Sequence, residues 1–119
     1  LTVSSSNATS SVITDATKGL QLVVYSCSVA WTINTGECSG GSGVEEISQK
    51  AIGGWTAQSF QNTSMASGSL KYLKMSLKLP DQSETTVNGN PPTPSIQGAT
   101  VDLTYTFDLA QRLSDTKNG

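Results

Sequence analysis

The clearest pattern in the chain is the stretch Val101-Asp102-Leu103-Thr104-Tyr105-Thr106-Phe107-Asp108-Leu109, in which apolar residues alternate with Asp or Thr. Successive side chains of a β-strand point to opposite faces, so this alternation places all the apolar side chains on one face and all the polar ones on the other. The stretch therefore predicts a half-buried strand, with one face in the core and the other in water.

A second alternating run, Leu-Lys-Met-Ser-Leu-Lys-Leu, occupies residues 73–79. Pro80 ends it because proline has no N–H to donate to a neighbouring strand. Just upstream, Leu70 and Tyr72 are in the opposite phase, which predicts either a β-bulge between Tyr72 and Leu73 or a strand covered on both faces at that end. We expect these two alternating runs to supply most of the core.

The other segments give shorter patterns. Residues 20–27 are apolar on both faces near their middle, which predicts a central strand, and residues 29–33 alternate and indicate a further strand or a continuation of it. Residues 44–51 have helical spacing over one or two turns, and residues 55–60 indicate an edge strand. Residues 80–100 predict a long irregular connection, which in a compact domain is usually functional or mobile.

The front of the chain is rich in Ser and Thr. A strand opening at Leu1, a loop over residues 4–11 and a turn over residues 15–19 are the elements expected there. The triplets that begin at Asn7 and Asn62 match the acceptor pattern for N-glycosylation, which is short enough to arise by chance.

Length and composition bound the class of protein. A chain of 119 residues predicts a single domain over residues 1–119, with a polar tail over residues 113–119. Charged residues make up only 13% and the net charge is -2, which argues against a nucleic-acid partner. No apolar run approaches the roughly 20 residues of a membrane span. The abundance of Ser, Thr, Asn, Gln and Gly is typical of secreted all-β proteins.

The two cysteines, Cys27 and Cys38, allow three interpretations. Free buried thiols in a cytosolic protein are one, and a metal site is another, although two thiols without any histidine form an incomplete ligand set. We favour a disulfide that closes a short loop, with a turn at residues 34–36 near its tip. A disulfide would fit an oxidising, extracellular location.

The sequence offers no recognisable catalytic, cofactor-binding or metal-binding residues. It contains no histidine, so catalytic triads and histidine-metal sites are excluded. We interpret four carboxylates as solvated surface charges: Glu45, Glu46, Asp102 and Asp108. We interpret three lysines as solvating groups that protect a strand edge: Lys71, Lys74 and Lys78.

Two long segments carry a resemblance to a known family. They read Tyr-Leu-Lys-Met-Ser-Leu-Lys-Leu-Pro at residues 72–80 and Gln-Gly-Ala-Thr-Val-Asp-Leu-Thr-Tyr-Thr-Phe-Asp-Leu-Ala-Gln-Arg at residues 97–112. They resemble the C-terminal half of the TasA/camelysin family, most specifically in the Gln-Gly segment and the alternating strand that ends in Phe-x-x-Ala-Gln. Residues 20–32, followed by Cys38, are similar to actinobacterial-type members.

The resemblance implies a secreted, jelly-roll-like antiparallel β-sandwich that assembles into fibres on the cell surface or in the biofilm matrix. Members of the family polymerise by donor-strand complementation, in which a strand of one subunit completes a sheet of the next. The further strands and the Gly-rich segment that usually open the family are not found here, so the chain is either a shortened member or lacks a piece. If Leu1 is the true start, the candidate for the exchanged or edge strand lies within residues 1–18, with Leu1, Val3, Val12 and Ile13 as its apolar positions.

The sequence thus leads to a non-enzymatic filament subunit whose partners are copies of itself. The alternative is a monomeric cell-surface adhesion or ligand-binding β-sandwich. In that case Trp31, Trp55 and Tyr25 would line a binding patch, and the connection over residues 80–100 would shape it. Two tryptophans in a domain of this size are more often core than platform, which favours the filament.

Overall fold

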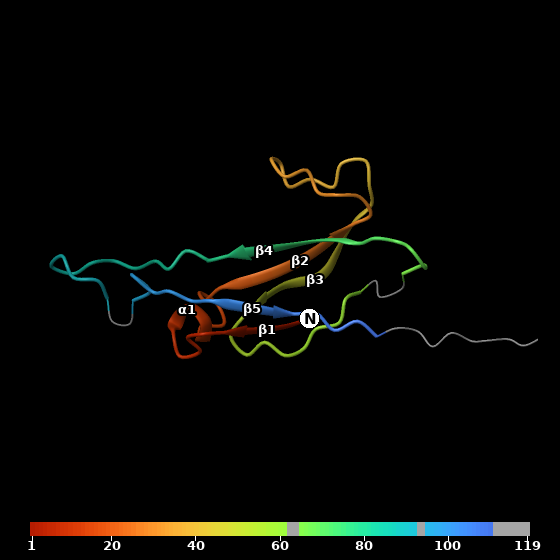
Figure 1. Cartoon of the computed structure of the whole chain (residues 1–119). Helices are drawn as coiled ribbons and strands as arrows, with labels where there is room; N and C mark the ends of the chain where they lie inside the picture. The colour runs from red at the N-terminus through yellow and green to blue at the C-terminus, as the bar shows by residue number, and fades with distance from the viewer. Residues whose placement is uncertain (62–64, 93–94, 111–119) are drawn as a thin grey trace, which may run out of the picture.

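The computed structural model describes residues 1–61, 65–92 and 95–110, and the regular secondary structure within these is almost entirely β-strand. In this part of the chain, five strands form two antiparallel sheets, and one short helix lies between the first two strands in the sequence (Figure 1). In chain order the elements are β1 (Thr2–Ser5), α1 (Ser11–Thr14), β2 (Gln21–Cys27), β3 (Gly43–Ala51), β4 (Tyr72–Lys78) and β5 (Leu103–Thr106). The predicted all-β class is confirmed at this level.

The larger sheet has the strand order β3-β2-β4, so the prediction of a central strand at β2 is confirmed. The β2–β4 register is unbroken from Gln21 opposite Lys78 to Cys27 opposite Tyr72. The bulge predicted beside Tyr72 is therefore wrong, and so is the alternative of a strand covered on both faces, because Leu70 is 70% exposed. The phase change simply falls where β4 begins.

The helix predicted over residues 44–51 is wrong, because this segment is strand β3. Val24 lies opposite Ile47 while the next residue, Tyr25, lies opposite Glu45, so Glu46 is an extra residue in the ladder. An extra residue of this kind is a β-bulge, which shifts the side-chain phase of a strand. The register shifts again between Leu22 and Val24, and these two irregularities give β3 the uneven apolar spacing that resembles a helical period.

The smaller sheet pairs β1 with β5, from Thr2 opposite Thr106 to Ser5 opposite Leu103. Leu103 and Tyr105 are half-buried and Thr104 is exposed, so the predicted two faces of this strand are confirmed. The strand is shorter than predicted because its partner β1 is short. Burial raises the pKa of Tyr105 above its ordinary value.

The core lies between the two sheets. The prediction that the two alternating runs supply most of it is wrong. One cluster contains the buried residues Val3, Ile13, Leu22, Val24, Ile47 and Ile52. These come from β1, α1, β2 and β3 and from the residue that follows β3. The apolar row of β4 is instead half-exposed, because the smaller sheet does not fully cover that side of the larger sheet.

The remaining segments are irregular. The edge strand predicted over residues 55–60 is wrong, although Leu1 and Gln58 exchange two backbone hydrogen bonds there. The strand predicted over residues 29–33 is also wrong, because these residues open a protruding loop. The predicted turn after α1 is present, where backbone N–H groups of Lys18 and Thr17 lower the pKa of Asp15 by donating to its carboxylate.

Candidate functional site

An apolar groove of about 560 Å³ opens between the start of β4 and the segment that follows β5. Figure 1 shows β1 and β5 beneath the larger sheet, with β5 the nearer of the two to β4 in this view. The groove is lined by Leu1, Ala57, Gln58, Ser59, Phe60, Met65, Lys71, Leu73, Phe107, Asp108, Leu109 and Ala110. The rings of Phe60 and Phe107 meet edge to face across it, with centroids 6.4 Å apart.

The apolar row of β4 continues the core face of the larger sheet. Directly opposite residues of paired strands share a face, and Leu77 lies opposite Leu22 while Met75 lies opposite Val24. Leu22 and Val24 are fully buried, whereas Met75 and Leu77 are 38% and 47% exposed. The core face of the larger sheet therefore extends beyond the smaller sheet and is only partly covered along β4.

The apolar row of β5 behaves in the same way at its C-terminal end. Phe107 and Leu109 are in phase with Tyr105, but they are 43% and 87% exposed. Within the described part of the chain, β5 hydrogen-bonds to β1 alone, so its second edge carries no strand. An uncovered apolar face beside an open strand edge is the geometry that accepts an added strand.

One end of the groove holds a buried ion pair. Lys71 is in phase with Leu73 and so points toward the core face, where its Nζ lies 2.8 Å from Glu46 Oε1. The Ser26 hydroxyl donates to the same oxygen at 2.6 Å. The side chain of Glu46 is fully buried and that of Lys71 is 16% exposed. The interpretation of Glu46 as a solvated surface charge is therefore wrong, and so is that of Lys71 as a solvating group at a strand edge.

The bulge in β3 decides which of two adjacent carboxylates faces the core. In a regular strand Glu45 and Glu46 would point to opposite faces, and nothing in their sequence tells which one faces the core. Glu45, Asp102 and Asp108 are exposed as predicted. The orientation of Lys71, however, is predictable from the sequence. It lies two residues before Leu73 and therefore on the same face as the apolar row of residues 73–79.

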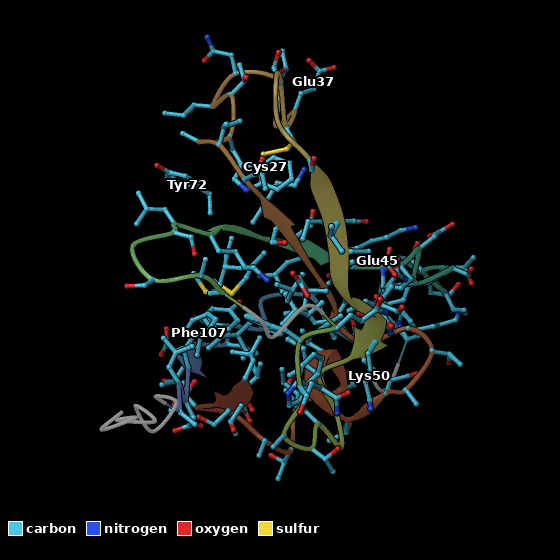
Figure 2. All side chains as sticks on the ribbon, turned by 90° about the vertical axis from the view of Figure 1, so that its right-hand side faces the viewer. Cys27, Glu37, Glu45, Lys50, Tyr72 and Phe107 are labelled. Atoms are coloured by element: carbon cyan, nitrogen blue, oxygen red, sulfur yellow. A yellow bond between two sulfur atoms is a disulfide. The ribbon has the colours of Figure 1, made fainter. Side chains whose placement is uncertain are left out.

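Opposite the groove, on the outer face of the larger sheet, a loop is held by several contacts. Cys27 and Cys38 form the predicted disulfide at its base, and Figure 2 shows Glu37 at its far end. Lys74 Nζ lies 4.2 Å from the ring centroid of Trp31 and 5.2 Å from that of Tyr25.

The same lysine donates to the backbone carbonyl of Gly36 at 2.6 Å, and Trp31 Nε1 donates to the carbonyl of Tyr72 at 3.0 Å. Trp31 and Tyr25 therefore flank one lysine, whereas Trp55 packs against the core cluster. The three aromatic residues named for a binding patch are not brought together in one place. Lys74 therefore binds the loop through Gly36 and Trp31 and is not only a solvating group.

The candidate exchanged-strand residues all lie in the front part of the fold. Val3 is buried in β1 and Ile13 is buried in α1, while Val12 is half-buried beside it. Leu1 lines the groove, and its ammonium donates to the carbonyl of Gln58 at 2.7 Å. The sequon at Asn62 and the tail over residues 113–119 lie outside the described residues.

None of the helices among the described residues is long and apolar enough to cross a membrane. In the same part of the chain, no three His, Cys, Asp or Glu side chains gather as a metal site would require. The chain matches no protein-family model, no curated protein and no solved structure with which it was compared.

Proposed function

We propose that this chain is a structural, non-enzymatic subunit of an extracellular filament and that its subunits join by donor-strand complementation. In this proposal an extended segment of one copy enters the groove of the next, pairs with the open edge of β5 and covers the apolar row of β4. The fold would then be a jelly-roll-like β-sandwich that is completed only in the assembly. The open, apolar face between β4 and β5 is the observation that carries the proposal.

Three further features support it. The sequence resembles the TasA/camelysin family at the strands that border the groove, β4 and β5. The Cys27–Cys38 disulfide suits an oxidising, extracellular location. Burying a large apolar side chain completely is worth about 1.5–3 kcal/mol, so covering side chains that are about half-exposed would contribute roughly half of that each.

The test compares two exposed apolar residues, one in the groove and one away from it. Leu109 is 87% exposed and lines the groove, whereas Ile33 is 96% exposed at the protruding loop. Because neither side chain contributes to the core, both Leu109→Asp and Ile33→Asp should leave the subunit folded. Circular dichroism and urea unfolding check this condition.

Negative-stain electron microscopy of the purified chain then reads out assembly. The proposal expects fibres for the unchanged chain and for Ile33→Asp, and none for Leu109→Asp, because a charge in the groove opposes entry of an apolar strand. Fibres of equal length and number in both variants would contradict the proposal. Particles that stay monodisperse for the unchanged chain would also contradict it.

A further inference from the structure

The geometry points to a second interface, in which the outer edge of β4 pairs antiparallel with β4 of another copy, centred on Met75. This pairing extends the larger sheet across a twofold axis. It is formed by the hydrogen-bonding edge of β4 and not by the edge of β5, and so it does not depend on strand complementation.

The β4 edge has the properties that strand pairing needs. Among the described residues, β4 pairs with β2 alone, and Figure 1 shows it as the outer strand of the sheet. Its ladder with β2 has no bulge, and it contains no proline between Tyr72 and Lys78. Bulges and prolines are the usual devices that stop an edge from pairing, and β4 has neither. Among the described residues, the lysines of β4 are the remaining feature of the strand that opposes pairing.

The faces of the strand limit the registers that are allowed. Apolar residues occupy the core face of β4, and Lys74 and Lys78 occupy the outer face with Ser76 between them. A shift by one residue would set the apolar row of one copy against the lysine row of the other. In a symmetric pairing, each residue must therefore lie opposite a residue on the same face of the other copy. Only registers in which the twofold axis passes through a residue position, and not between two residues, meet this condition.

Charge then selects among these registers. Centring on Lys74 places this residue opposite its own copy, and centring on Ser76 places Lys74 opposite Lys78 twice, so both registers oppose like charges. Centring on Met75 places Lys74 opposite Ser76 and Leu73 opposite Leu77, with no lysine opposite a lysine. Registers shifted further overlap too few strand residues.

The Met75 register also joins the exposed apolar rows. Leu73, Met75 and Leu77 of the two copies become one continuous apolar strip, which removes part of their exposed surface from water. Pairing ends near Tyr72, whose carbonyl already accepts from Trp31 Nε1. Contacts with Gly36 and Trp31 fix the position of the Lys74 ammonium on the outer face of its own copy.

The test places opposite charges at one exposed position. In the symmetric pairing, residue 76 faces Lys74 twice, so Ser76→Glu should tighten the dimer and Ser76→Lys should weaken it. The dissociation constant should change by roughly 2- to 30-fold in each direction. Gln49→Glu and Gln49→Lys make the same changes in net charge at an exposed position on β3, and should leave the dissociation constant unaltered. Sedimentation velocity over a range of protein concentrations measures these constants.

Cysteine cross-linking reports the register itself. With the native disulfide intact, Met75→Cys should form a disulfide between two copies rapidly, because residue 75 faces itself, whereas Ser76→Cys should react slowly. The inference is overturned if the chain stays monomeric at all concentrations. It is also overturned if charges at positions 76 and 49 have equal effects, or if the Ser76→Cys variant cross-links as fast as the Met75→Cys variant. Because Leu109→Asp leaves the β4 edge intact, failure of filament assembly and failure of this pairing are separate results.

Discussion

Replacing Lys71 by methionine tests the buried ion pair at the end of the groove. The substitution keeps most of the side-chain volume and removes the ammonium that lies 2.8 Å from Glu46 Oε1. Glu46 has no side-chain exposure, so its carboxylate cannot recover the lost interaction from bulk water without a change in structure. Breaking a buried ion pair by removing one partner generally costs about 3–5 kcal/mol.

We expect a value at the lower end of this range, about 3 kcal/mol, for two reasons. The Ser26 hydroxyl still donates to Glu46, and the Lys71 side chain already retains some contact with solvent. A loss of this size is a large part of the roughly 5–15 kcal/mol that stabilises a typical domain. Urea unfolding followed by tryptophan fluorescence measures it directly.

Lys78→Met is the matched control, because Lys78 is exposed on the outer face of the same strand. It should change the free energy of unfolding by less than about 0.5 kcal/mol. The double variant Glu46→Gln with Lys71→Met should recover part of the loss, since the buried charge is then gone. If Lys71→Met were no more harmful than Lys78→Met, the ion pair would not be the buried, stabilising contact described above.

Three further substitutions probe the rest of the fold. Replacing both Cys27 and Cys38 by serine should lower the free energy of unfolding by about 2–4 kcal/mol, measured in urea. Asp15 has a lowered pKa in the folded state, so its contribution is present above the unfolded-state pKa and is lost as the pH falls through the folded-state pKa. The free energy of unfolding should therefore fall less steeply from neutral to acidic pH for Asp15→Asn than for the unchanged chain. Gly53→Ala should cost about 1–3 kcal/mol in thermal or urea unfolding, because the added methyl would collide with the backbone carbonyl of Ile13. An unchanged free energy of unfolding for the cysteine or Gly53 variant would contradict the corresponding contact, and so would an unchanged pH dependence for Asp15→Asn.

The parts of the fold that were predictable depend on local pattern. The apolar residues on both faces of β2 predicted a central strand, and the alternation around Leu103 and Tyr105 gave the faces of β5. Cys27 and Cys38 predicted a disulfide because a short loop with a turn separates them. In each case a few neighbouring residues carry the information, and distant contacts agree with it.

The parts that failed depend on partners that are distant in the sequence. Alternation shows that β4 has one apolar face, but how much of that face is buried depends on the number of strands in the opposite sheet. Among the described residues only β1 and β5 are found there, so Met75 and Leu77 remain half-exposed. The bulge at Glu46 is likewise a property of the pairing between β2 and β3, and residues 44–51 alone do not distinguish it from a helical period.

Strand complementation requires that another copy of the chain fill the groove between the start of β4 and the segment that follows β5. Electron cryo-microscopy of the assembled filaments tests it most directly. The map should show a strand from a neighbouring subunit, hydrogen-bonded to the open edge of β5 and packed on Met75 and Leu77. Filaments whose subunits meet elsewhere and leave the groove empty would contradict the claim.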